Sequence, residues 1–147
     1  MKKYKTYRYN FSALGTDGFA SFTDDYNNPV TYLPIPAGWD RIIAQLDVTT
    51  ANGTSPTLDC KFKTLVNNGG TAPVTGTLNL TDSNGTAFAM TQSTAASNEI
   101  KAIARKGSDA DGPGISNAGT WLAAFLDFGG TSPAFTGTLS IAIECDN

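Results

Sequence analysis

Few side chains in this sequence could carry out chemistry, and histidine is absent from its 147 residues. Without an imidazole, the chain lacks Ser-His-Asp and Cys-His catalytic arrangements and the histidine ligands of many zinc sites. Its two cysteines, Cys60 and Cys145, are too few for a four-thiolate zinc site. We therefore expect no cofactor, no metal centre and no enzymatic activity.

The carboxylates form two local clusters, Asp24-Asp25 before Asn27-Asn28, and Asp109-x-Asp111-Gly112. Calcium prefers such oxygen ligands, but an EF-hand loop needs further ligands and a closing Glu that DADGPGISNAGT lacks. Both clusters are typical of Asx-turns, with a specific metal site as the alternative. Thirteen acidic residues could also place two carboxylates across a sugar, as in a glycosidase, but the sequence singles out no pair.

The N-terminal segment MKKYKTYRYN alternates basic and aromatic residues. Three interpretations are open: a strip that follows a nucleic-acid backbone, a solvent-facing first strand, or an arm on an acidic neighbouring protein. A net charge of −3 argues against general attraction to nucleic acid or anionic membranes. No apolar stretch has the length of a signal-peptide core or a membrane span, so we expect folding in the cytosol.

The tryptophans and cysteines each allow two interpretations. Trp39 and Trp121 could form a stacking platform for a sugar ring, or they could pack in the core or an interface. Cys60 and Cys145 fall on the apolar faces of expected strands, where a reduced thiol behaves as a small hydrophobic group. Free thiols are favoured, and a disulfide is the alternative.

The tetrapeptide Gly-Thr-Ser-Pro occurs twice, at 53–56 and 130–133. Glycine reaches positive φ, and proline suits the first residue of a strand, so each copy indicates a turn that leads into a strand. Apolar residues alternate with polar ones around both copies, as in Leu58-x-Cys60-x-Phe62. We predict two antiparallel hairpins, over 39–66 and 121–145.

Composition favours strands throughout. Charged residues make up only 16% of the chain, and Thr, Gly, Ser and Asn are abundant. Further strands are expected within 11–36, at 75–80 and 86–91 around the TDSNGT turn, and near 99–105, followed by the loop KGSDADGPGISNAG. The predicted fold is all-β: a single antiparallel β-sandwich of jelly-roll type with about eight strands. It occupies residues 11–147, and residues 1–10 form the N-terminal arm.

The segment WLAAFLDF is apolar on both faces. One face, from Leu122 to Phe128, fits the core. The other face carries Trp121, Ala123 and Phe125, which either form a subunit interface or are buried within the monomer.

The two segments 39–66 and 119–147 resemble small structural proteins of tailed bacteriophages. The similarity lies in Leu-Asp-Val or Leu-Asp-Phe, Gly-Thr-Ser-Pro and an alternating strand such as TLDCKFK, within a histidine-free, Thr/Gly/Asn-rich sequence. The resemblance implies a virion protein without catalytic residues, either a capsid decoration (cement) protein or a neck, tail or fibre-associated module. It leaves the N-terminal arm and the central residues unmatched.

The resemblance implies binding to the major capsid protein of an assembled head, as a homo-oligomer with a trimer favoured, on a particle assembled in the host cytoplasm. The capsid-binding candidates are the residues of the arm: Lys2, Lys3, Tyr4, Lys5, Tyr7 and Arg8. Deletion of residues 2–9 would then lower capsid occupancy. A carbohydrate-binding, receptor-recognition domain is the alternative function.

Overall fold

The computed structural model describes residues 2–65, 78–81, 84–92, 97–104 and 121–146. These residues form ten β-strands and no helix, so they contain no helix that could cross a membrane. The strands are β1 (Lys2–Leu14), β2 (Gly18–Phe19), β3 (Phe22–Thr23), β4 (Pro29–Val30), β5 (Leu33–Pro34), β6 (Trp39–Leu65), β7 (Leu78–Asn79), β8 (Ala89–Gln92), β9 (Ser97–Ala104) and β10 (Trp121–Asp146). The predicted all-β class is confirmed.

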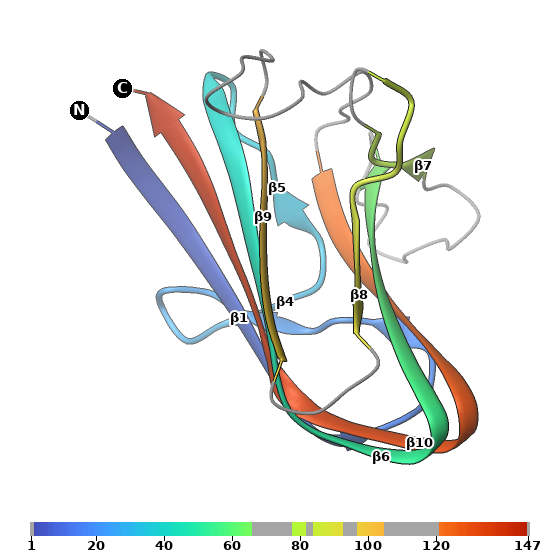
Figure 1. Cartoon of the computed structure of the whole chain (residues 1–147). Coiled ribbons are helices and arrows are strands. Elements are labelled where there is room, and N and C mark those ends of the chain that lie inside the picture. The colour runs from blue at the N-terminus through green and yellow to red at the C-terminus, as the bar shows by residue number, and fades with distance from the viewer. Residues whose placement is uncertain (1, 66–77, 82–83, 93–96, 105–120, 147) are drawn as a thin grey trace.

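Two very long strands, β6 and β10, dominate the structure. They pair antiparallel along nearly their whole length, from Trp121 opposite Leu65 to Cys145 opposite Trp39. Figure 1 shows both strands bending at the same end of the molecule and returning, so that the ribbon they form has two arms. The first arm contains residues 39–50 of β6 and 135–146 of β10, and the second arm contains residues 57–65 and 121–129.

The bend lies at the two Gly-Thr-Ser-Pro segments, and the predicted hairpins are wrong. Neither segment turns a strand back on itself, because 39–65 and 121–146 are each one continuous strand that pairs with the other. Thr54 lies opposite Thr131, with Asn52 opposite Ala134 and Thr57 opposite Gly129, so the pairing has a local two-fold symmetry about the two threonines. The repeated segment therefore forms the two halves of one corner.

The backbone of this corner requires its glycines. Gly53 and Gly130 have φ of 117° and 93°, a region that residues with a Cβ avoid. A Cβ on Gly53 would lie 2.7 Å from the carbonyl oxygen of Ser132, and one on Gly130 would lie 2.7 Å from that of Thr54. The strands β6 and β10 cross too closely at this point for a side chain. This explains why both strands need a glycine at the same place in the repeated segment.

The shorter strands extend the ribbon on both sides. In the first arm β1 pairs with β10 and β9 pairs with β6, and β3 and β4 follow β1. In the second arm β7 and β8 pair with β6, and β2 and β5 pair with β10. All ten strands belong to one sheet with antiparallel pairing. This agrees with the predicted antiparallel all-β class, while the eight-stranded jelly-roll sandwich stays a prediction.

One hydrophobic core holds the two arms together. The alternating apolar residues of both long strands are buried in it, as predicted from the period of two. Phe128 and Phe135, on either side of the bend in β10, approach to 5.8 Å between ring centroids. The fully buried residues include Ile42, Leu46, Leu58, Leu126, Phe135, Leu139 and Ile143.

The predicted strand near 99–105 is confirmed by β9, and the strands at 75–80 and 86–91 correspond to the shorter β7 and β8. The TDSNGT segment is bridged by Thr81 opposite Ala87. The loop KGSDADGPGISNAG, with Asp109 and Asp111, lies outside the described residues.

Candidate functional site

The basic, aromatic N-terminal segment is a strand of the sheet. Lys2 to Phe11 of β1 pair residue by residue with Asp146 to Gly137 of β10, which agrees with the interpretation as a first strand. The side chains alternate between the outer surface and the core. Tyr7 is only 6% exposed and packs in the core, so this predicted contact residue is not available at the surface, whereas Lys3, Tyr4, Lys5 and Arg8 are exposed.

Lys2 is held in an ionic network. Its ammonium group lies 2.6 Å from Asp40 and 3.3 Å from Glu144, and these hydrogen bonds, that to Asp40 first, raise the Lys2 pKa. Burial of Glu144 opposes its ionisation, but hydrogen bonds from Tyr4, Arg41 and Lys2 outweigh burial and lower its pKa. The Arg41 guanidinium donates to Glu144 over 3.0 Å. Lys2 thus joins β1 to the ends of β6 and β10.

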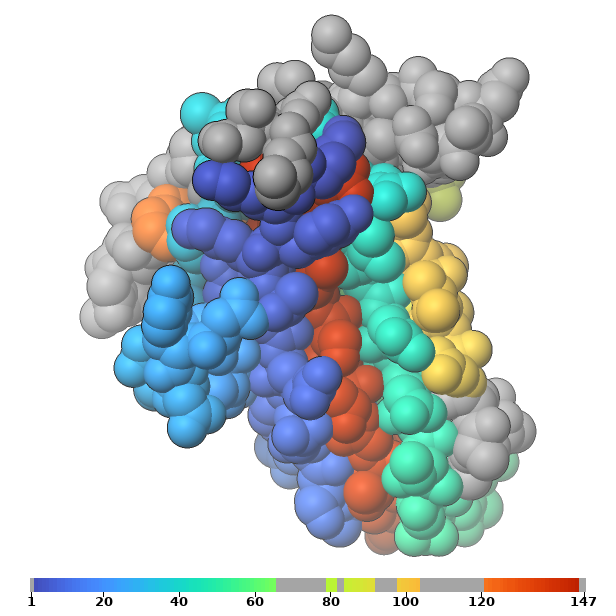
Figure 2. Space-filling view, turned by 90° about the vertical axis from the view of Figure 1, so that its left-hand side faces the viewer, coloured from blue at the N-terminus to red at the C-terminus, as the bar shows by residue number. Residues whose placement is uncertain are grey.

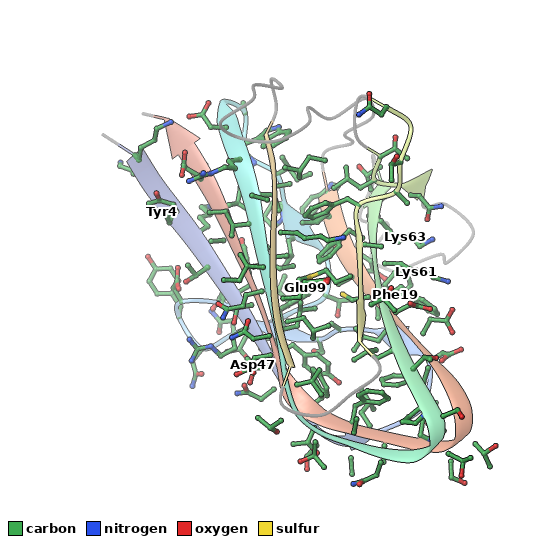
Figure 3. The ribbon with its side chains drawn as sticks, in the orientation of Figure 1. Tyr4, Phe19, Asp47, Lys61, Lys63 and Glu99 are labelled. Carbon is green, nitrogen blue, oxygen red and sulfur yellow. The ribbon has the colours of Figure 1, made fainter. Side chains whose placement is uncertain are left out.

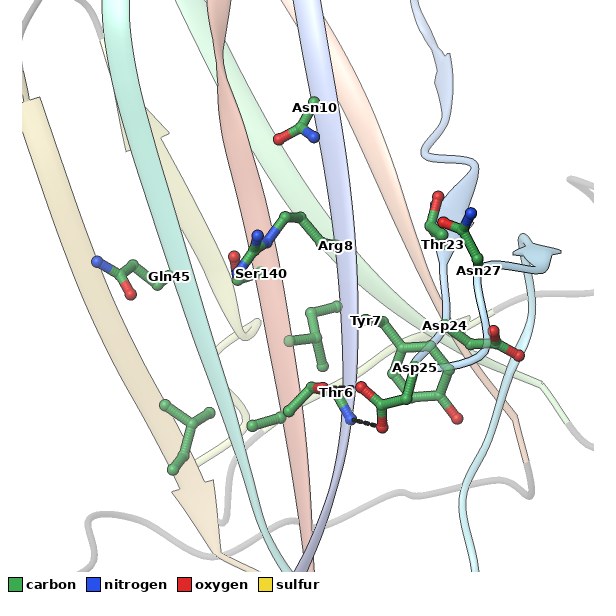
Figure 4. Close-up of a pocket in the computed structure, with 13 residues that line it drawn as sticks. Thr6, Tyr7, Arg8, Asn10, Thr23, Asp24, Asp25, Asn27, Gln45 and Ser140 are labelled. Carbon is green, nitrogen blue, oxygen red and sulfur yellow. Dashed lines mark hydrogen bonds between the residues drawn. The ribbon is translucent and has the colours of Figure 1, made fainter.

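A polar cleft of about 560 Å³ crosses the outer surface of the first arm. Its floor is formed by β1, β10 and β6, and one wall is the segment 23–27 beyond the edge of β1. In Figure 4 the Arg8 side chain extends from β1 across to Ser140 of β10. Asn10 and Gln45 also line the cleft, and in Figure 4 Asn10 lies above Arg8 on the same strand while Gln45 lies beyond Ser140.

The wall of the cleft is fixed by its two aspartates. Asp24 accepts hydrogen bonds from the backbone N–H groups of Tyr26 and Asn28, both 2.9 Å, which is an Asx-turn of the predicted kind. The Asp25 carboxylate accepts hydrogen bonds from the hydroxyl and the backbone N–H of Thr6. It therefore provides a partner for a backbone N–H at the edge of β1. No group of three potential metal ligands occurs among the described residues.

Two further hollows adjoin the cleft. One, of about 220 Å³, shares Arg8, Asn10, Gln45 and Ser140 with it and adds Asp47 and Thr138. The other, of about 470 Å³, shares Thr6, Tyr7, Asp24 and Asp25 and adds a basic, aromatic end. That end includes Lys3, Tyr4, Lys5 and Tyr26. The three hollows share lining residues along β1 and around its edge, and we call them together the β1 groove.

Figure 2 shows the surface that contains the groove. The strands β1, β10, β6 and β9 lie side by side as blue, red, cyan and yellow stripes, and a light-blue segment projects beside β1. Figure 3 places Tyr4 on the outside of β1, on the side of the molecule opposite Lys61 and Lys63 of the second arm. The groove and the outer surface of the second arm are therefore separate surfaces.

The predicted interface residues Trp121, Ala123 and Phe125 lie on the second arm. Ala123 is fully buried within the chain, and the Phe125 ring packs on Phe19 with centroids 5.2 Å apart. Tyr32 extends this cluster at 6.2 Å from Phe19. Segments from the first third of the chain thus cover much of this face, as in the predicted alternative of burial within the monomer.

The remaining candidates are structural. Trp39 is 7% exposed and part of the core, so it cannot contribute to an exposed platform with Trp121. Cys60 and Cys145 are free, as favoured from the sequence. They lie in different arms, and burial, helped by the nearby Glu99 charge, raises the Cys60 pKa.

Sequence reasoning missed Asn10, Gln45 and Ser140 as neighbours of Arg8. The alternation of β1 places Thr6, Arg8 and Asn10 on one face, and this signal was present in the sequence. The pairing of Arg8 with Ser140, and of Ser140 with Gln45, depends on the register of three strands distant in sequence.

Comparison with known proteins shows no family. No family model matches the chain, and no curated protein matches it. Among solved structures, it is similar to a chain of the Bacillus endospore appendages, described as a family of disulfide-linked pili. The identity is 14% and the TM-score 0.45, over 98% of this chain and 87% of that chain. A similarity this distant carries no argument about function, and the phage resemblance stays a prediction.

Proposed function

We propose that this protein is a non-enzymatic structural protein of a tailed-bacteriophage particle, a decoration protein that binds the assembled head. Its partner would be the major capsid protein, and it would act as a homo-oligomer, in the trimeric form that the resemblance favours. In this proposal the two arms form a β-sandwich of the jelly-roll class. Binding only to the assembled shell would stabilise that shell by mass action.

The observation that carries the proposal is the basic start of β1. Lys3, Lys5 and Arg8 are exposed and have no ion pair among the described residues, although the chain as a whole is acidic. The paired strand holds Lys3 and Lys5 on one face and Arg8 on the other, so a neighbouring acidic surface would contact the two lysines at little cost in conformational entropy. Each exposed ion pair contributes little, but many copies on a shell add their effects.

The N-terminal segment cannot be tested by deletion. Removal of residues 2–9 would take away a paired strand and the buried Tyr7, so loss of binding would report unfolding. The double substitution Lys3→Gln/Lys5→Gln changes the same surface without touching the core. Its control is Lys61→Gln/Lys63→Gln, which removes two equally spaced lysines from the second arm. Because Lys61 pairs with Asp127 and Lys63 donates to Asn79, the stability of the control is measured alongside its binding.

The experiment is co-sedimentation of the purified protein with assembled heads and with unassembled capsid protein, with light scattering for its oligomeric state. We expect saturable binding to heads alone, weakened by Lys3→Gln/Lys5→Gln and unchanged in the control. Absence of binding by the unsubstituted protein would contradict the decoration role and favour a tail, neck or fibre position. Equal binding by both variants would show that the basic start of β1 is not the contact.

Glycan recognition is the second candidate function. The tryptophan platform that suggested it is not available, because Trp39 is buried. The β1 groove is the observation that favours this function.

A further inference from the structure

We propose that the β1 groove binds a short oligosaccharide, with Arg8 at its centre. The inference rests on the second candidate function and does not require binding to a shell. It assigns a ligand class to a surface built from β1, β10, β6 and the segment 23–27.

The shape of the groove fits a chain of small units. The central cleft of about 560 Å³ has the volume of a small-ligand site, and the adjoining hollows of about 220 and 470 Å³ extend it in two directions. Because neighbouring hollows share lining residues, a linear ligand could follow β1 from Asn10 past Arg8 to Tyr4. A compact ligand would occupy only one of the three.

The groove offers hydrogen-bonding groups that the protein leaves unused. The backbone of Arg8 pairs with β10 and β3, but its side chain has no hydrogen bond or ion pair to another described residue, so the five guanidinium donors are available. The Asn10 side-chain oxygen accepts from Thr138 over 2.8 Å, and this leaves the Asn10 amide nitrogen free to donate. The Gln45 amide nitrogen donates to Asn98 over 3.1 Å, and this leaves the Gln45 oxygen free to accept.

This combination of donors and acceptors suits sugar hydroxyls. A hydroxyl both donates and accepts, and planar amide and guanidinium groups can contact two neighbouring hydroxyls at once. The strand pairing and the cross-strand bonds of Asn10 and Gln45 hold their two amide groups in place before a ligand arrives. Such preorganisation lowers the entropic cost of binding.

The other end of the groove offers aromatic surface. Tyr26 is 85% exposed and Tyr4 is 52% exposed, the two most exposed aromatic side chains among the described residues. Tyr26 sits on the Asx-turn that Asp24 closes, so its backbone is fixed while its ring is open to solvent. An exposed, positioned tyrosine ring can pack against the apolar face of a sugar.

The charges of the groove argue against nucleic acid. Lys3, Lys5 and Arg8 are matched in number by Asp24, Asp25 and Asp47, which line the same three hollows. A polyphosphate backbone would meet three carboxylates along its path, whereas a saccharide with few charges would not. The groove therefore favours hydroxyl groups over a regularly charged polymer.

The test uses the full chain on an array of immobilised neutral and acidic oligosaccharides, followed by titration calorimetry with the strongest member. We expect Arg8→Ala to weaken binding by about tenfold or more, since it removes charge-assisted hydrogen bonds. Arg8→Lys should weaken it as well, because an ammonium group lacks the planar fork of donors. Tyr26→Ala should reduce the gain in affinity between shorter and longer members of one series.

The matched pair of variants is Asn10→Ala, in the groove, and Asn52→Ala, an exposed asparagine at the bend. We expect several-fold weaker binding for Asn10→Ala and no change for Asn52→Ala. The inference is overturned if the unsubstituted protein binds no array member. It is also overturned if Arg8→Ala and Asn10→Ala both bind as the unsubstituted protein does.

The two proposals fail separately. The array contains no capsid protein, and head co-sedimentation contains no free saccharide. Saccharide binding without head binding would remove the decoration role and leave the groove. Head binding without saccharide binding would support the decoration role and overturn the assignment of a saccharide to the groove.

Discussion

The bend of the long ribbon and the outer surface of β1 are specified in different ways. At the bend, two copies of Gly-Thr-Ser-Pro meet, and the close crossing of two backbones determines which residues are allowed. On β1 the backbone is ordinary extended strand, and the properties of the surface come from side chains such as Arg8. The repeated motif therefore forms the architecture, and residues outside any motif form the candidate site.

Substitution of the bend glycines should give the largest effect. Gly53→Ala or Gly130→Ala forces a Cβ into positive φ and against a carbonyl oxygen of the other strand, so we expect a loss of about 3 kcal/mol or more in unfolding free energy. Urea denaturation, monitored by circular dichroism, measures this loss.

Two other glycines separate the effect of positive φ from the effect of the close contact with the other strand. Gly85 has φ of 79° but open space around it, so Gly85→Ala should cost only about 1 kcal/mol. Gly18 has neither constraint, and Gly18→Ala should be nearly neutral. If Gly53→Ala cost no more than Gly85→Ala, the close crossing would not determine the sequence of the bend.

Substitutions of Tyr7 and Tyr4 test the difference between the two faces of β1. We expect Tyr7→Ala to lower the unfolding free energy by about 3 kcal/mol, because it leaves a cavity in the core. Tyr4→Ala, on the exposed face, should cost less than about 1 kcal/mol. Thermal unfolding of both variants measures the difference, and equal costs would contradict the assignment of Tyr7 to the core and Tyr4 to the surface.

Ionisation of Glu144 should make the unfolding free energy depend on pH. Its pKa is lower in the folded than in the unfolded protein, so its contribution is present above the unfolded pKa and is lost as pH falls through the folded pKa. Glu144→Gln should lower the unfolding free energy at neutral pH by about 1.5 kcal/mol, since charge-assisted hydrogen bonds are lost.

The measurement is the unfolding free energy from neutral pH down to about pH 3, below the ordinary carboxylate range. The difference between Glu144→Gln and the unsubstituted protein should shrink as the pH falls. A difference independent of pH would show that ionisation of Glu144 does not stabilise the fold.

Ser55 and Ser132 should give the smallest effect, with the opposite sign. Both serines have positive φ, 49° and 51°, which glycine adopts more easily. Ser132→Gly should therefore change the unfolding free energy by less than about 1 kcal/mol and in the stabilising direction, offset by the greater freedom of glycine in the unfolded chain. A large destabilisation would mean that the serine side chain, and not the backbone, holds the corner.

The candidate site was only partly predictable. The sequence drew attention to the basic, aromatic start of the chain, and Lys3, Tyr4, Lys5 and Arg8 are indeed exposed. The alternation separates Tyr7 from Thr6 and Arg8, but it could not show which of the two faces of β1 the rest of the chain would cover. Ser140 and Gln45 reach Arg8 through pairings that span most of the chain, and no local pattern encodes them.

The sequence by itself determined the class of the fold and the faces of the long strands. The period of two from Ile42 to Val48, and again from Leu139 to Ile143, was sufficient to place these residues in the core, since alternation depends only on local backbone geometry. The tertiary structure alone decided what the repeated tetrapeptide does. A glycine-rich joint before a strand fits a hairpin or a corner equally well, and the choice depends on whether the strand pairs with itself or with another. Here β6 and β10 pair with each other over almost their whole length, so the two joints meet as one corner.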